Sequence, residues 1–156
     1  MSGDGLKGTL LAPNPLLPHL QPSDFMVTSP PAIDYNCICW AAGDSDLFWW
    51  PDRAMQAYWP PEIDRVCSVE SFVKAFSLQG YQVCANGDPE DGFEKVVIYV
   101  DALEIPQHMA RQLPGGQWTS KLGQAEDIEH VNLGCLAGGI YGQPAVYLMR
   151  RKDATN

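Results

Sequence analysis

The strongest hydrophobic periodicity lies between residues 68 and 79. Four apolar side chains there recur at positions i, i+3, i+4 and i+7, which places them on one face of a helix. They are Val69, Phe72, Val73 and Phe76. Gly80 follows directly, and glycine is common just beyond a helix end. We therefore predict a structural helix over residues 68–79.

A second helix is expected nearer the N-terminus, at about residues 34–42. Asp34 is a good N-cap residue, and Gly43 is a stop signal. Cys37 and Trp40 lie three positions apart within this segment. The spacing predicts that they share one face of the helix.

The second half of the chain alternates β-branched and aromatic residues with turn signals, which is typical of strands. The expected strands cover residues 81–84, 93–100, 107–113, 117–122 and 145–150. The third and fourth form a hairpin around Pro114-Gly115-Gly116, and a short helix at about 126–133 precedes the last strand. This order predicts an α+β fold, with N-terminal helices packed on a mostly antiparallel sheet of four to five strands.

Residues 1–32 carry six prolines and three glycines. Proline lacks the N–H group that helices and central strands need. We interpret residues 1–32 as a proline-rich arm and residues 33–152 as a single domain. Leu16, Leu17 and Leu20 would anchor an arm that lies over the domain, and a disordered tail is the alternative.

The 156-residue chain has a formal net charge of −9, from 10 basic and 19 acidic side chains. Phosphate backbones and anionic lipid surfaces would be repelled, so we expect neither nucleic acid nor a membrane as a partner. The charge suits a neutral or basic protein or peptide, as substrate or as partner. The oligomeric state stays open.

The five cysteines, at positions 37, 39, 67, 84 and 135, are odd in number and show no CxxC spacing. This pattern argues against a disulfide framework and favours a reducing compartment. Prolines interrupt the apolar stretch 10–20, so it resembles neither a signal peptide nor a membrane span. We expect a cytoplasmic protein, although an effector exported without a cleaved signal would look the same.

Cys37 is the first candidate for chemistry, because it would lie in the first turn of the 34–42 helix. The partial positive charge and the free N–H groups of a helix start favour a thiolate and stabilise an oxyanion beside it. The competing interpretation is an inert buried cysteine, the commonest fate of a free thiol.

His108 is the best candidate for a base among the three histidines. It lies in the predicted strand 107–113, and a strand holds a side chain firmly enough to take a thiol proton. His19 belongs to the arm, and His130 would lie on a solvated face of the 126–133 helix, one turn after Asp127. A purely structural histidine is the alternative.

The hairpin supplies an orienting group if Gln112 pairs with Trp118. The alternating side chains of the two strands then bring Ser120 next to His108. A slip of one residue would put Thr119 or Lys121 there instead. The sequence alone leaves this register open.

A helix-borne cysteine in Asn36-Cys37-Ile38-Cys39-Trp40-Ala41, followed by a strand-borne His108 and a further strand with a polar residue, resembles the papain-like cysteine hydrolases. The similarity covers roughly residues 34–150 and points to the compact bacterial NlpC/P60 and CHAP amidases, and to an uncharacterised group of small bacterial domains. It implies a papain-like fold, with Cys37 as nucleophile and His108 as base. The third family residue maps loosely onto Ser120 or Gln117.

The substrate-binding candidates are Trp40, Trp49, Trp50, Gln117 and Trp118. Aromatic rings that line a cleft would contact a peptide. The alternative is that these rings pack in the core or in a lid, which is the ordinary role of large aromatic side chains.

Metal and cofactor sites have little support. Cys37, Cys39, His108 and His130 contain zinc-ligand atoms, but two ligands at i and i+2 on a helix point apart. The glycine-rich stretch 134–142 lacks the Lys and Ser/Thr of a phosphate loop. We expect no metal and no cofactor.

The leading hypothesis is a cysteine-dependent hydrolase that acts on an amide bond, as a peptidase, an amidase or a glutamine deamidase. Cys37 attacks the carbonyl, and His108 protonates the leaving amine. The alternative is a non-catalytic acidic binding or inhibitor protein on a papain-like fold. The small size and the acidity of the chain favour this alternative.

Overall fold

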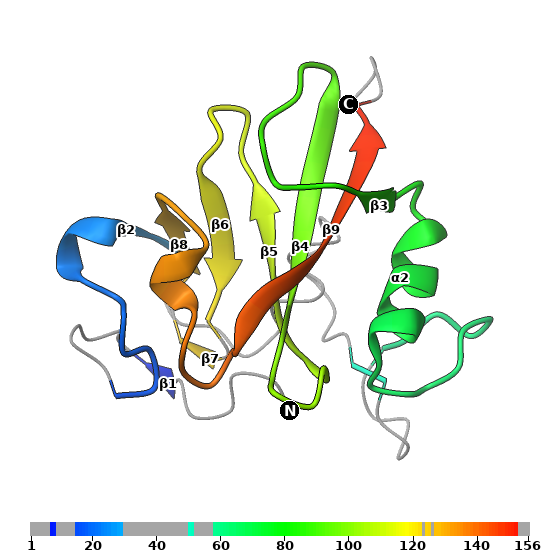
Figure 1. Cartoon of the computed structure of the whole chain (residues 1–156), viewed down its shortest axis with the longest axis horizontal. Coiled ribbons are helices and arrows are strands. Elements are labelled where there is room, and N and C mark those ends of the chain that lie inside the picture. The colour runs from blue at the N-terminus through cyan, green and yellow to red at the C-terminus, as the bar shows by residue number, and fades with distance from the viewer. Residues whose placement is uncertain are drawn as a thin grey trace.

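A computed structural model of the chain describes residues 7–8, 15–29, 50–51, 58–122, 124–125 and 127–152. The strands of its main sheet are β2 (Phe25–Ser29), β3 (Gln82–Cys84), β4 (Phe93–Val100), β5 (Pro106–Gln112), β6 (Trp118–Lys121), β8 (Asp127–His130) and β9 (Gln143–Arg151). They lie side by side in the order β2-β8-β6-β5-β4-β9-β3, and all their pairings are antiparallel (Figure 1). A small parallel pair joins β1 (Lys7–Gly8) to β7 (Gln124–Ala125).

The strand β4 carries both hydrophobic cores. It pairs with β5 on one side and with β9 on the other. Its run of β-branched and aromatic residues suits a strand that is packed on both faces, and residues 95–100 are all buried. Successive side chains point to opposite faces, so β4 contributes buried side chains to one core on each side of the sheet.

The first core lies under the helix α2 (Val69–Ser77), which stands beside β3 in Figure 1. The Ser68 side chain caps this helix by accepting a hydrogen bond from the Ser71 N–H at 3.1 Å. The helical face then packs on the sheet. The buried residues of this core include Phe72, Phe76, Val96, Ile98, Met109 and Leu148. The helix predicted over residues 68–79 is thereby confirmed.

The second core is covered by the N-terminal arm and by the segment before β9. Leu17 and Leu20 are completely buried there, beside Tyr99 and Tyr141. The Ile140 N–H donates a hydrogen bond to the Leu16 carbonyl at 3.0 Å, which ties the two covering segments together. The arm leucines therefore anchor residues 15–20 on the sheet.

One glycine makes this contact between the arm and the turn sterically feasible. A Cβ atom on Gly139 would lie 2.0 Å from the Leu16 carbonyl oxygen. No side chain fits at that separation, so the turn before β9 depends on glycine at this position.

The predicted fold class is wrong. We expected N-terminal helices on four to five strands, but the described residues form a seven-stranded antiparallel sheet with one α-helix, α2, and two short 3₁₀ helices, η1 (Pro22–Asp24) and η2 (Gly134–Leu136). The strand β2 was missed from the sequence because all of residues 1–32 were treated as proline-rich. Pro22 and Pro30 lie outside the strand, so the missing N–H group of proline does not interrupt its pairing. The helix predicted at 34–42 lies outside the described residues.

The short helix predicted at about 126–133 is also wrong, because this segment contains strand β8. Its acidic residues fit a helix locally, but β8 lies between β2 and β6 and pairs with both. Tertiary pairing thus overrides a weak local preference. The five strands that were predicted agree with β3, β4, β5, β6 and β9 to within two residues at either end.

The helix finding also bears on membranes. Among the residues that the structure describes, no helix is long and apolar enough to cross a bilayer.

We predict that Leu17→Ala lowers the free energy of unfolding by about 2–5 kcal/mol, because it empties a completely buried site. Urea unfolding followed by tryptophan fluorescence measures the change. Met26→Ala, at a side chain that is 60% exposed, is the matched control and should change stability by no more than about 0.5 kcal/mol. Equal, small effects of both variants would show that the arm adds nothing to stability.

Candidate functional site

The hairpin between β5 and β6 has the register that joins His108 to Ser120. Gln112 pairs with Trp118, which is the pairing that the predicted contact between His108 and Ser120 requires. The Nε2 atom of His108 lies 3.0 Å from the Ser120 hydroxyl oxygen, and both side chains are completely buried. The predicted contact between these two residues is confirmed.

His130 extends this pair into a chain of three side chains, and the sequence analysis misplaced it. Its Nε2 atom lies 2.7 Å from the Ser120 hydroxyl oxygen, and its Nδ1 atom lies 2.9 Å from the Asn132 carbonyl oxygen. His130 is 1% exposed, so the expectation of a solvated helix face is wrong. The alternation of Ile128, Glu129 and His130 was the available signal, because period two is the pattern of a strand.

Both imidazole rings are neutral at pH 7. Burial, with a smaller repulsion from His130, holds the pKa of His108 well below its usual 6.5. Burial also lowers the pKa of His130 from 6.5 to about 4, against a small opposing effect of the hydrogen bond to Asn132. The core therefore holds two uncharged rings bridged by one hydroxyl group.

The proton positions in this chain follow from its last acceptor. A carbonyl oxygen only accepts, so the proton of neutral His130 is on Nδ1 and points to Asn132, and Nε2 accepts. Ser120 then donates its single hydroxyl proton to His130. Its oxygen accepts from the Nε2–H of His108, which leaves Nδ1 of His108 unprotonated.

Two tyrosine rings fix the plane of the His108 ring. The Tyr141 ring is stacked on it, with ring centroids 4.0 Å apart and an interplanar angle of 15°. Tyr99, its partner across the β4–β5 pairing, approaches edge-on at 5.2 Å. The imidazole can therefore not rotate without displacing a packed ring.

The unprotonated Nδ1 of His108 is the feature that sets this ring apart. Among the described residues it has no hydrogen-bond partner, although the side chain is completely buried. A buried acceptor without a donor costs about 1–3 kcal/mol. Such a nitrogen has an unused lone pair that can accept a proton, which is the property that a general base requires.

The other predicted site residues fall into three places. Cys37, Trp40 and Trp49 lie outside the described residues. Trp50 packs edge-on against Phe72 at 6.0 Å in the first core, and Trp118 is 4% exposed in the second core. Gln117 is exposed in the hairpin turn. The structure thus places Trp50 and Trp118 on opposite faces of the sheet.

The described cysteines differ in their exposure. Burial raises the pKa of the Cys67 thiol and of the Cys135 thiol to about 11. The Cys135 thiol donates a hydrogen bond to the Asn132 carbonyl at 3.2 Å, and Cys84 is half-buried at the end of β3. Cys67 and Cys135 are therefore poor nucleophiles near neutral pH.

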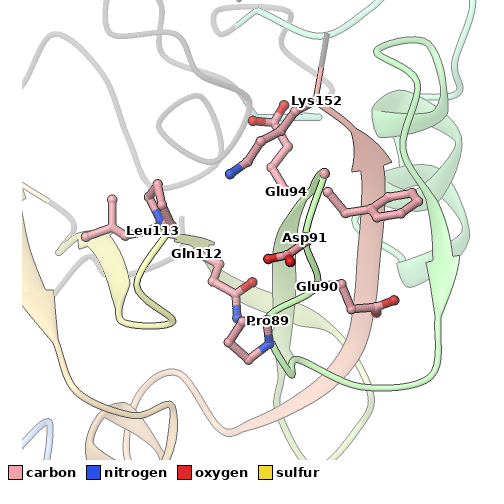
Figure 2. A pocket seen from close by; sticks show the side chains of 10 residues that line it. Pro89, Glu90, Asp91, Glu94, Gln112, Leu113 and Lys152 are labelled. Carbon is pink, nitrogen blue, oxygen red and sulfur yellow. The ribbon is translucent and has the colours of Figure 1, made fainter. Parts of the chain in front are cut away.

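A separate polar cavity of about 190 Å³ lies between the start of β4 and the end of β5 (Figure 2). Three acidic residues line it, Glu90, Asp91 and Glu94. Two of them already have cationic partners, since Glu90 lies 2.5 Å from Lys95 and Glu94 pairs with Arg150. His108 and Ser120 do not line this cavity, so it is distinct from the buried chain.

The described residues offer little to a metal ion. Within them, no three His, Cys, Asp or Glu side chains gather closely enough to coordinate one. Both ring nitrogens of His130 are already engaged, by Ser120 and Asn132.

Residues 26–149 match a family described as a domain of unknown function, DUF7689. The match covers most of the chain, so the protein belongs to this family. No curated protein and no solved structure matches the chain.

We predict that the protein loses stability as the pH falls from 6.5 towards 4, in part because His130 must be protonated on unfolding. The unfolded chain takes up this proton near pH 6.5, whereas the folded protein resists it until about pH 4. The stabilisation is complete above pH 6.5, and about 3 kcal/mol is lost by pH 4.

Urea unfolding at a series of pH values tests this prediction. His130→Gln should flatten the pH dependence of the free energy of unfolding by about that amount. Parallel curves for the wild type and His130→Gln would contradict it.

Proposed function

We propose that this protein is a cysteine-dependent hydrolase that acts on an amide bond, with His108 as the base and Cys37 as the nucleophile. The observation that supports this is the Nδ1 atom of His108, a buried acceptor with no partner among the described residues. Its orientation is fixed by Ser120 through Nε2. Cys37 is assigned from its expected position at a helix start.

The proposed reaction uses the two nitrogens of His108 differently. Nδ1 takes the thiol proton of Cys37, and the thiolate sulfur forms a bond to the substrate carbonyl carbon. The resulting oxyanion is held by backbone N–H groups at the helix start. His108 returns the proton to the leaving amine as the C–N bond breaks, and water then hydrolyses the thioester. Peptidases, amidases and glutamine deamidases share these steps.

Ser120 has a positioning role in this scheme. It accepts the Nε2–H of His108, so this nitrogen is engaged and the lone pair of the ring is on the opposite side, at Nδ1. The hydrogen bond persists when His108 becomes an imidazolium, because Nε2 keeps its proton. The serine hydroxyl therefore supports both protonation states of the base.

Burial determines when His108 carries charge. A neutral resting ring, with its pKa well below 6.5, acts as a general base and does not hold a permanent imidazolium. A thiolate that forms beside the ring favours the imidazolium by direct attraction, so the two groups titrate as a pair. The positive charge on His108 then exists only while a negative charge balances it.

The second candidate function is a non-catalytic binding protein, and the complete burial of His108 favours it. In this case the two histidines and Ser120 hold three strands together. Binding would use the acidic surface, with a neutral or basic protein as partner. The two functions differ in whether Cys37 and His108 are chemically coupled.

We predict that Cys37 reacts first among the five cysteines with limiting iodoacetamide at pH 7. Cys67 and Cys135 are almost entirely in the unreactive thiol form, because the pKa of each is about 11. Tryptic mass spectrometry identifies the modified residue. Preferential modification of Cys84 or Cys39 would remove the reason for choosing Cys37.

We further predict that His108→Gln slows alkylation of Cys37 severalfold at pH 7. Without the acceptor at Nδ1, the pH–rate profile should move towards that of a free thiol, whose pKa is about 8.5. His19→Gln is the control, since this histidine is exposed in the arm. Circular dichroism shows whether each variant is folded.

The same variants test hydrolysis directly. Release of aminomethylcoumarin from a panel of peptide amides, and of ammonia from glutamine-containing peptides, should be abolished by Cys37→Ala and reduced about 100-fold or more by His108→Gln. An unchanged alkylation profile in folded His108→Gln would show that the two residues are not coupled. The binding function would then be the better proposal.

A further inference from the structure

The Asn132 turn holds the far end of the hydrogen-bonded chain in place. The Asn132 carbonyl oxygen accepts from His130 Nδ1–H at 2.9 Å and from the Cys135 thiol at 3.2 Å. The Asn132 side-chain oxygen accepts from the Cys135 N–H at 2.9 Å. This carbonyl is therefore fixed by the turn that follows β8, and it is not free to follow His130.

The turn is also attached to the strand β4. The Tyr99 hydroxyl donates to the Leu133 carbonyl at 2.6 Å, and the Tyr99 ring lies edge-on to His108. Tyr99 of β4 thus contacts both the turn that holds His130 and the imidazole ring of His108. His108 and Asn132, at the two ends of the hydrogen-bonded chain, are therefore both positioned by contacts with Tyr99 or the turn that it holds.

We propose that His130 is a positioning residue that fixes the tautomer of His108 through Ser120. The Ser120 hydroxyl group has one proton, which it can donate either to His108 or to His130. His130 accepts that proton because its own proton is committed to Asn132. Ser120 can then only accept from His108, which keeps the proton of His108 on Nε2 and the lone pair on Nδ1.

Loss of the acceptor on His130 reverses this order. If Nε2 of His130 is removed, the Ser120 proton turns to His108 and is accepted by its Nε2. The proton of the neutral His108 ring then moves to Nδ1, which becomes a donor and can no longer take a proton from a thiol. His130 itself cannot replace the base, because both of its nitrogens are engaged in the chain.

The position of the proton is therefore set three hydrogen bonds away from the nitrogen that would do the chemistry. This control of the tautomer is a property of the folded chain, and its role in catalysis rests on the proposed function. The two claims can fail separately, since a tautomer is observed without a substrate.

The experiment is a long-range proton–nitrogen correlation spectrum of the protein labelled with ¹⁵N-histidine at pH 7. The wild type should show His108 with a protonated Nε2 and an unprotonated Nδ1, and His130 with the opposite arrangement. In His130→Leu, the His108 Nδ1 resonance should move upfield to the position of a protonated nitrogen, and the Nε2 resonance should move downfield. His19 provides an internal reference for an exposed ring.

His130→Gln is the conservative variant, because its side-chain carbonyl can still accept the Ser120 proton. It should retain the wild-type tautomer of His108 and most of the alkylation rate of Cys37, whereas His130→Leu should lower that rate severalfold. Ser120→Ala breaks the same link with a smaller change, and it should abolish the strong preference for Nε2–H even if His130→Leu does not fold.

A wild-type His108 that is protonated on Nδ1 would overturn the proposal. So would an unchanged His108 tautomer in folded His130→Leu or in Ser120→Ala. If the tautomer changes as expected while Cys37 alkylation stays the same in every variant, His130 does set the tautomer, and the hydrolase function is the claim that fails.

Discussion

Ser120 has one hydroxyl proton and two imidazole neighbours, with donor–acceptor distances of 3.0 Å to His108 and 2.7 Å to His130. The three residues come from three adjacent strands, β5, β6 and β8, so the chain exists only in one register of the sheet. A slip of one residue would turn each of these side chains to the other face. Every buried polar group left without its partner would then cost about 1–3 kcal/mol.

The covering segments follow from the same requirement. Hydrogen bonds strengthen when water is excluded. The second core excludes water with residues from the N-terminal and the C-terminal parts of the polypeptide. Leu17 and Leu20 come from the arm, while Tyr141 comes from the turn before β9. The strand β2 also pairs along the outer side of β8, so the strand that carries His130 is not an edge. The arm is therefore part of what keeps both rings uncharged.

The sequence predicted the contact between His108 and Ser120, because the alternation on both sides of Pro114-Gly115-Gly116 puts these side chains on one face when Gln112 pairs with Trp118. It also predicted α2, whose apolar spacing and Ser68 cap are local signals. It failed for β8, since the identity of that strand depends on β2 and β6, which are far away or across a turn. Because β8 was missed, the contact of His130 with Ser120 was missed as well. The fold class was wrong for the same reason, as a sheet of this width is assembled from non-local pairings.

The chemistry of His108, Ser120 and His130 supports the proposed proton-transfer role over a purely structural one. Three apolar side chains of similar volume would hold β5, β6 and β8 together without the desolvation of two imidazoles and a hydroxyl group. A structural network would also be expected to satisfy all of its polar atoms, yet Nδ1 of His108 has no partner among the described residues. The unmatched atom is the one that the hydrogen bonds of the chain leave unprotonated. An unused acceptor held in a fixed orientation brings no benefit to folding, but it is what a proton-transfer site needs.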